Sequence, residues 1–177
     1  AKKTAKAAAP KPAPKPEIKP IDGYNDLPIG FVEADDLIVL IGNADATAEA
    51  TYESNSSVDA IARGAIDAGL VRSVRNCDKS VARAVCECAN TGDKGAFIVF
   101  DGDLTAEPAD AGKAPLRILA SVSMENESEL LDRLRGAGVP CSAIGRVMND
   151  WQVNFDNVAS VDLNWLKSDF NAAVASI

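Results

Sequence analysis

The 177-residue sequence contains no histidine. Histidine is the side chain that most often acts as a general base near neutral pH, and it completes the Ser-His and Cys-His pairs of many nucleophilic enzymes. Its absence excludes those arrangements, and nothing in the sequence places Asp, Glu, Lys or Tyr together as a replacement. We therefore expect no catalytic residue in this chain and no enzymatic activity.

Cysteine is scarce, and its spacing does not fit a metal site. The thiols belong to Cys77, Cys86, Cys88 and Cys141. On a helix, two residues separated by one position point about 200° away from each other, so Cys86 and Cys88 cannot easily bind one ion. The alternatives are a metal site and small buried thiols in a reducing compartment, and the spacing favours buried thiols. We expect neither a metal nor a cofactor.

Long apolar runs are also missing. No stretch approaches the length of about 20 apolar residues that spans a bilayer, and the N-terminal residues have no apolar signal-peptide core. We therefore expect a location in the cytoplasm, or in a particle assembled there, without secretion through a signal peptide.

Charge is divided unevenly along the chain. Residues 1–20 hold six lysines and one glutamate, a local charge of +5, so the remaining 157 residues carry −13 of the net −8. An acidic body repels nucleic acid and anionic membranes. Neither is an expected partner of the body, and other protein subunits are the expected partners.

Residues 1–20 are rich in lysine, proline and alanine. The alternating prolines between Pro10 and Pro16 favour an extended polyproline II conformation and forbid a helix. The segment is interpreted either as a solubilising tail or as an arm that lies on a neighbouring subunit. In the second case its lysines bind the partner, namely Lys2, Lys3, Lys6, Lys11, Lys15 and Lys19.

Hydrophobic periodicity predicts the elements that follow. Strands are expected at 36–42, 95–101, 116–122 and 142–148, with a hairpin at 151–161. Helices are expected at 56–70, 80–90 and 126–135, and a last helix from 162 onward. The alternating run at 116–122 is typical of a half-buried strand, and Ser56-x-x-Asp59 is typical of a capping box. Trp151 and Trp165 are expected in the core.

This order of elements indicates the fold class. Adjacent strands in a mixed order are typical of an α+β fold, in which a mixed β-sheet carries helices mainly on one face. We predict an extended arm over residues 1–20, an irregular lead-in over 21–35 and a single α+β domain over 36–177.

The segment Val71–Ala82, which reads VRSVRNCDKSVA, holds the candidates for ligand binding. Two arginines precede a predicted helix start, where free backbone amides and the helix dipole favour an anion such as phosphate. The candidate residues are Arg72, Arg75, Asn76, Lys79 and Ser80. The alternative is a solvated rim whose cations offset an acidic body.

An acidic loop is a second candidate site. It contains Asp101, Asp103, Glu107 and Asp110. Several carboxylates could attract a hard cation such as calcium, but the spacing departs from that of an EF-hand. The alternative, which we prefer, is a solvated loop without a metal.

Several segments resemble, in order, the C-terminal domain shared by aminoimidazole ribonucleotide synthetase and phosphoribosylformylglycinamidine synthase. Residues 29–42 are similar to the family's entry strand, 116–122 to a later strand, and 131–147 to its "LLEEAGVPAAVIGRV" run. The motif at 71–82 resembles the family's "GLVRSAHDVSDGG", with Arg75 and Asn76 in place of its His-Asp pair. Lys79 and Ser80, or Ser80 and Val81, stand in place of its Gly-Gly pair.

The resemblance implies the fold of that domain over residues 29–175. In the family this domain follows an N-terminal domain that supplies much of the ATP site and the dimer core. A chain of this length is therefore not expected to be an intact purine-pathway enzyme, and the changed motif implies that the family's ligand-binding groups are lost.

We therefore expect a non-enzymatic structural subunit of a larger homo- or hetero-oligomeric assembly, such as a virion shell or capsid decoration protein. It would dock through its body and be anchored by the N-terminal arm. Two alternatives remain open. One is the C-terminal part of a split, phosphoribosylformylglycinamidine synthase-like ATP-dependent ligase with a nucleotide or phosphoribosyl site around residues 72–80. The other is a small-ligand-binding regulatory module.

Overall fold

The computed structural model describes residues 4–177 of the chain. The strands are β1 (Leu37–Ile41), β2 (Ser73–Asn76), β3 (Gly95–Ile98), β4 (Ile118–Val122), β5 (Cys141–Met148), β6 (Gln152–Phe155) and β7 (Ala159–Asp162). The helices are α1 (Tyr52–Asp67), α2 (Val81–Gly92), α3 (Glu127–Gly136), α4 (Leu163–Ser168) and α5 (Phe170–Ala175). Short 3-10 turns lie at Tyr24–Asp26, Ala111–Lys113 and Met124–Asn126.

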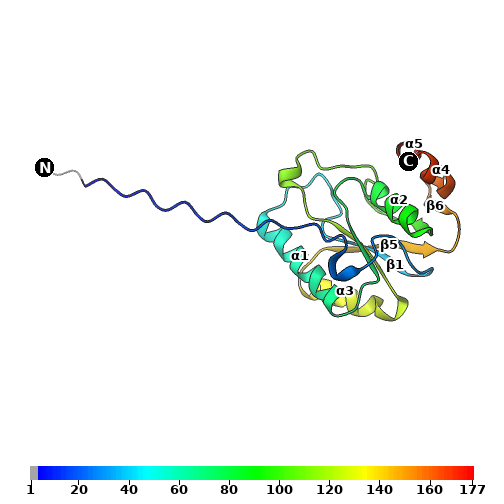
Figure 1. Ribbon diagram of the computed structural model, residues 1–177, viewed down its shortest axis with the longest axis horizontal. Coiled ribbons are helices and arrows are strands. Elements are labelled where there is room, and N and C mark those ends of the chain that lie inside the picture. The colour runs from blue at the N-terminus through cyan, green and yellow to red at the C-terminus, as the bar shows by residue number, and fades with distance from the viewer. Residues whose placement is uncertain (1–3) are drawn as a thin grey trace.

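All seven strands form one sheet in the order β2-β4-β1-β5-β3-β6-β7. Neighbouring strands are antiparallel except β3 and β6, which are parallel. The α+β class and the mixed sheet predicted from the sequence are therefore confirmed. Residues 4–20 contain no helix or strand, and they leave the body as an extended segment (Figure 1).

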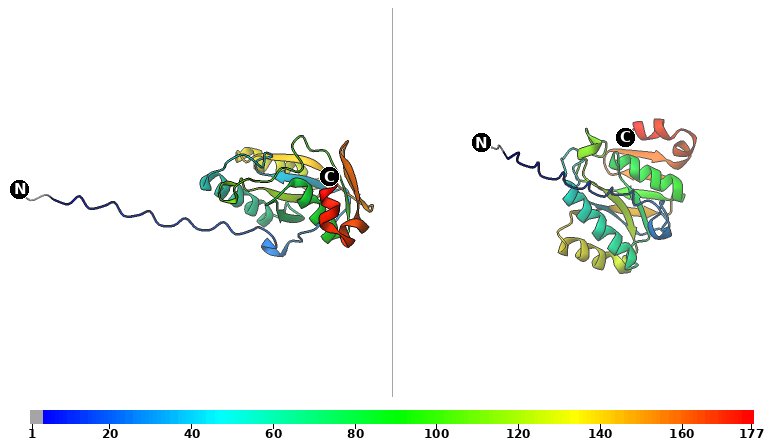
Figure 2. Two further views of the ribbon diagram at one scale, coloured as in Figure 1. Left: turned by 90° about the horizontal axis from the view of Figure 1, so that it is seen from above. Right: turned by 60° about the vertical axis from the view of Figure 1, so that its left-hand side comes forward.

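Helices cover both faces of the sheet around β1, so the expected placement of helices mainly on one face is wrong. The double cover explains why this strand is apolar at every position. Leu37, Val39 and Ile41 pack in one core cluster with α1 and α3. Ile38 and Leu40 point to the opposite face and pack with α2, α4 and α5. Figures 1 and 2 show these two groups of helices on either side of the sheet. A strand buried on both faces loses the alternation of a half-exposed strand.

The same burial corrects the prediction for residues 116–122. β4 lies between β2 and β1, and all five of its residues are buried. The half-buried strand expected from the alternating sequence is therefore wrong, because both faces of β4 are covered. Arg117, which the alternation would place toward solvent, is only 1% exposed.

The first helix begins earlier than predicted. Thr51 is its N-cap: the Thr51 hydroxyl accepts a hydrogen bond from the Ser54 amide at 3.1 Å, and the Ser54 hydroxyl accepts one from the Thr51 amide at 3.2 Å. This is a capping box closed by serine instead of Glu or Gln. The expected box at Ser56 is wrong because Ser56 lies inside the helix.

The C-terminal region also departs from the sequence prediction. The hairpin is confirmed as β6 and β7, but the last helix is divided at Asp169, whose carboxylate caps α5. Trp151 and Trp165 are 40% and 41% exposed, so their predicted core positions are wrong. The inward face of α4 is taken by Leu163 and Leu166. Within residues 4–177, none of the helices combines the length and apolarity that crossing a membrane requires.

Candidate ligand-binding site

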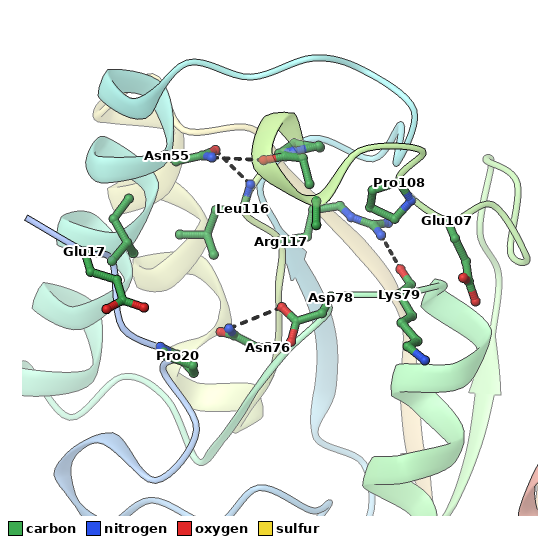
Figure 3. A pocket seen from close by; sticks show the side chains of 14 residues that line it. Glu17, Pro20, Asn55, Asn76, Asp78, Lys79, Glu107, Pro108, Leu116 and Arg117 are labelled. Carbon is green, nitrogen blue, oxygen red and sulfur yellow. Dashed lines mark hydrogen bonds between the residues drawn. The ribbon is translucent and has the colours of Figure 1, made fainter. Parts of the chain in front are cut away.

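A cavity of about 500 Å³ lies where β2 ends and β4 begins. Because the two strands are antiparallel neighbours with Asn76 opposite Ile118, the turn after β2 meets the loop before β4. The Cys77 amide donates to the Arg117 carbonyl at 2.9 Å across this junction. The walls come from this turn, from the loop that precedes β4, from α1 and from the end of the arm near Glu17 and Pro20 (Figure 3).

A second cavity of about 180 Å³ shares part of this wall. Asn76, Asp78 and Lys79 line both spaces, and the smaller one is completed by Ser80, Arg83 and Glu87 at the start of α2. The turn between β2 and α2 therefore presents its polar side chains to one continuous region of the surface.

Arg117 is the cation buried in the wall of the larger cavity. Its guanidinium donates to the Lys79 carbonyl (Figure 3), and its Nε has no hydrogen-bond partner in the described part of the chain. Among residues 4–177 no carboxylate forms an ion pair with it. Burying a charge without a counter-ion costs several kcal/mol, which makes Arg117 a candidate ligand-binding residue of this cavity.

The backbone that carries Arg117 is fixed from two sides. The Asn55 side chain on α1 donates to the Ala114 carbonyl at 3.0 Å and accepts from the Leu116 amide at 2.8 Å. Gly42, which follows β1 with a φ of 105°, lets the chain approach Leu116 closely: a Cβ there would lie 2.2 Å from the Leu116 carbonyl oxygen. The guanidinium is thus held by a rigid frame.

Of the five ligand-binding candidates predicted from the sequence, the two arginines form ion pairs and the other three lie at the cavities. Arg72 pairs with the buried Asp36, with 2.6 Å between Nε and Oδ2, and burial raises the pKa of the Asp36 carboxyl although Arg72 counteracts it. Arg75 pairs with Glu87 on α2 at 3.4 Å. Neither arginine lines the two cavities described above, although Arg72 and Asp36 line a separate cavity of about 500 Å³.

The other three candidates lie at the cavities. Asn76 holds the start of the lead-in. Its side-chain oxygen accepts a hydrogen bond from the Ile21 backbone amide at 3.1 Å, and its backbone amide donates one to the Asp22 carboxylate at 2.7 Å. Ser80 is the N-cap of α2 and accepts from the Arg83 amide at 3.2 Å. Lys79 is exposed and forms no ion pair with any residue between 4 and 177. Lys79 alone of the five keeps its side chain free for a ligand.

Residues 15–22, which we call the strap, hold the lead-in against the body. Lys15 pairs with Glu53 on α1, an exposed contact that adds little stability. The Arg63 side chain donates to the Lys19 carbonyl at 2.8 Å, and Ile21 is buried in the core. The predicted role of the arm lysines in binding a partner stays a prediction, and Lys2 and Lys3 lie outside the described residues.

The acidic loop uses its carboxylates in local turns. Asp103 accepts from the Thr105 amide and hydroxyl, and Asp110 accepts from the Gly112 amide. Glu107 lines the large cavity. Within residues 4–177 no group of three or more potential ligands is placed to hold a metal ion.

The cysteines pack as buried thiols. Cys77, Cys86 and Cys88 are buried and Cys141 is partly buried. Burial raises the pKa of the Cys77 thiol to about 11 and that of Cys86 to about 12, and it raises the pKa of Cys88 further. Thiols in this state are protonated at neutral pH and are poor nucleophiles.

Sequence reasoning missed Arg117, Asp78 and Glu107 as cavity residues. Arg117 could have been noticed in the sequence, because it is a single charged residue at the start of an otherwise apolar predicted strand. The alternation of that strand hid the signal, because it indicated a solvent-facing position.

No protein-family model matches the sequence. The phosphoribosylformylglycinamidine synthase subunit PurL of Moorella thermoacetica is 34% identical over 95 residues, which are 53% of this chain and 13% of that protein. The crystal structure of phosphoribosylformylglycinamidine synthase II from Thermotoga maritima aligns with a TM-score of 0.65 at 17% identity, covering 79% of this chain and 27% of that chain. This chain thus spans about a quarter of the synthase whose structure it matches.

A third relative has a different activity. Thiamine-monophosphate kinase from Stenotrophomonas maltophilia aligns with a TM-score of 0.53 at 10% identity, over 73% of this chain and 52% of that chain. At these identities the structural alignments show the fold, and the fold agrees with the resemblance seen in the sequence.

These relatives correct the expected function. The expected non-enzymatic structural subunit, whether a virion shell or a capsid decoration protein, is contradicted, because the protein similar in sequence is a subunit of a synthase. The absence of histidine does not exclude an enzyme, because reactions such as phosphoryl transfer rely on positioning and electrostatic stabilisation, which Arg, Lys and backbone amides can supply. The chain has an aminoimidazole ribonucleotide synthetase-like fold and is similar to a part of phosphoribosylformylglycinamidine synthase.

Proposed function

We propose that this chain is the C-terminal-domain part of an ATP-dependent ligase similar to PurL, and that it binds an anionic substrate of that enzyme. The observation that carries the proposal is the buried guanidinium of Arg117, which pairs with no carboxylate among residues 4–177 and lines a cavity of about 500 Å³. The similarity to PurL supports it. The PurL of Thermotoga maritima has been solved with ATP, with ADP and with FGAR.

The chain contributes binding and orientation to such a reaction. It has no histidine to act as a base, and its buried thiols are protonated at neutral pH. Holding a substrate in place and stabilising charge account for a large part of catalysis in phosphoryl and acyl transfer. The remaining groups would come from a partner domain or subunit, since the chain spans about a quarter of the synthase. A cytoplasmic location belongs to this proposal.

Calorimetric titration tests the proposal. The 177-residue chain is titrated with FGAR, ATP and ADP, first alone and then with the N-terminal ATP-binding region of a PurL protein. We expect saturable binding of FGAR or ATP in at least one of these mixtures. Adenosine, which carries no phosphate, serves as the uncharged control. Absence of binding in every mixture would refute the proposal.

A small-ligand regulatory module is the second candidate. This candidate is favoured because two residues of the segment 71–82 make contacts within the fold: Arg75 pairs with Glu87, and Asn76 binds the strap. The ligase part and the regulatory module differ in whether the chain supports ATP consumption. A ligase part restores ATP consumption to a complementary N-terminal fragment, whereas a regulatory module binds its ligand and restores none.

A further inference from the structure

We infer that residues 105–110, which we call the flap, form a cover over Arg117 that opens when the cavity is empty and closes on a bound anion. The inference concerns how the site of the proposed function is regulated, and it rests on that function in taking an anion as the ligand. It follows from the burial of Arg117 and from the few contacts that hold the flap.

Arg117 lines the cavity and is nevertheless only 1% exposed. Its guanidinium donates to the Lys79 carbonyl, and its buried Nε has no hydrogen-bond partner among residues 4–177. The flap contributes Glu107 and Pro108 to the same cavity, and Figure 3 shows both at the end of the cavity where the guanidinium lies. In this conformation a ligand cannot reach Nε, so the structure shows the cover closed.

Both ends of the flap are fixed to the body. Leu104, which precedes the flap, packs in the core, and its carbonyl accepts a hydrogen bond from the Ala82 amide at 3.0 Å. After the flap, the Lys113 carbonyl accepts a hydrogen bond from the Ala50 amide at 2.9 Å. A span between two fixed ends can swing as a unit about its end residues.

The span between these ends is held by contacts within the loop. The Asp103 side chain accepts from the Thr105 amide at 2.9 Å. In the part of the chain that the structure describes, no hydrogen bond or ion pair joins residues 105–109 to the rest of the body. A gap of about 60 Å³ separates part of the flap from residues 46–49. Few contacts and incomplete packing lower the free energy of local opening.

The charge of Arg117 opposes closure while the cavity is empty. Closing the flap removes a guanidinium from water without giving it a counter-ion, which is strongly unfavourable. An anion under the flap supplies that counter-ion, and hydrogen bonds from a guanidinium to an oxyanion are among the stronger ones in proteins. The anion therefore favours the closed state over the open one, and such a difference is what a ligand needs to shift a conformational equilibrium.

Hydrogen exchange of the flap amides in the full 177-residue chain tests the inference. Arg117→Met removes the charge at similar size, so the empty flap should stay closed. In a buffer without phosphate or sulfate, we expect exchange at residues 105–107, 109 and 110 to slow by about 10-fold or more relative to the unmodified chain. Equal or faster exchange in a folded Arg117→Met chain would overturn the inference, because a flap held down by contacts with Arg117 would loosen.

Two further variants separate the charge from other effects. Arg117→Lys retains the charge and should leave flap exchange close to that of the unmodified chain. Arg133→Met is the matched control, since Arg133 also donates to a backbone carbonyl, that of Gly64 at 3.1 Å, but lies on α3. Slower flap exchange in Arg133→Met would mean that net charge, and not the position of Arg117, controls the flap.

Inorganic phosphate gives a second measurement, which keeps the test decisive if Arg117→Met does not fold. In the unmodified chain, phosphate should slow flap exchange relative to chloride at equal ionic strength. Equal exchange in the two salts would contradict closure on an anion. Where Arg117→Met folds, phosphate should have no effect on its flap, and a persistent slowing would show that the anion acts elsewhere.

The outcomes separate the flap from the proposed function. Slower flap exchange in Arg117→Met, together with no binding of FGAR or ATP in any mixture, would leave the flap standing and sink the ligase proposal. Saturable binding of FGAR, together with flap exchange that is indifferent to phosphate and to Arg117→Met, would support the ligase proposal and sink the flap.

Discussion

At the scale of single residues, the structure separates arginines that pair with a carboxylate from one that does not. Arg72 and Arg75 were prominent in the sequence, yet each is neutralised by an acidic partner, Asp36 and Glu87. Arg117 was inconspicuous and has no such partner among the described residues. The distinction depends on contacts between distant segments, which the local sequence pattern does not report.

Gly42 carries a prediction at this scale. Its φ is 105°, and an added Cβ would lie 2.2 Å from the Leu116 carbonyl oxygen. Gly42→Ala should therefore lower the free energy of unfolding by about 2 kcal/mol or more, through backbone strain and the displaced loop. Gly69→Ala is the control, because Gly69 has a φ of 75° but no atom within 4 Å of the added Cβ. Equal losses in urea denaturation would contradict this account of Gly42.

The buried thiols predict how stability depends on alkaline pH. Their folded pKa is raised, to about 11 for Cys77 and about 12 for Cys86, from a value of 9.0. Stability from these groups is complete below pH 9 and is lost as the pH rises toward 11, at about 1.4 kcal/mol per pH unit for each thiol. Urea unfolding at pH 8 and pH 10.5 measures the loss. Cys86→Ala should show a smaller loss than the unmodified chain, and an equal loss would refute the assignment to the thiol.

At the scale of elements, local sequence patterns predicted most strands and helices, whereas tertiary contacts determined where each element ends and how far it is buried. Strand β1 and the hairpin of β6 and β7 could be predicted from the sequence, because hydrophobic periodicity and turn-forming residues are local signals. The burial of β4 could not be predicted from its own sequence, because it depends on elements distant in the chain that pack on both faces of the strand. The cavity is the same kind of feature: it arises where β2 and β4 are brought side by side.

The start of α1 offers a direct test of an element boundary. Thr51→Ala should lower the free energy of unfolding by about 1 kcal/mol, because the Ser54 amide loses its acceptor. Ser56→Ala should change it by less than about 0.5 kcal/mol, since Ser56 lies inside the helix. Thermal unfolding of both variants measures the difference. A larger effect at Ser56 than at Thr51 would mean that the helix begins where the sequence suggested.

At the scale of the whole molecule, the N-terminal segment has two parts with different energetics. Residues 4–14 are exposed, whereas the strap is tied to α1 and β2 and buries Ile21 to 1% exposure. The predicted boundary of the arm at residue 20 falls inside the strap. Composition could not reveal this, because the lysines and prolines continue through a segment that packs on the body.

Truncation distinguishes the two parts. Removing residues 1–14 should leave the melting temperature unchanged. Removing residues 1–22 should lower the free energy of unfolding by about 2–3 kcal/mol, mainly through loss of the buried Ile21 side chain. It should also raise hydrogen exchange at β2, whose Asn76 amide is bound to Asp22. A chain starting at residue 23 with unaltered stability would show that the strap does not support the body.

The strand order has a consequence for synthesis of the chain. β1 pairs with β4 on one side and β5 on the other, so the apolar run LIVLI has no strand partner until Ile118 and later residues have been made. At roughly 5–20 residues per second, ribosomes would leave this run unpaired for about 4–15 s. The nascent chain is therefore a natural client for chaperones that shield extended apolar segments, and its yield at high expression should depend on them.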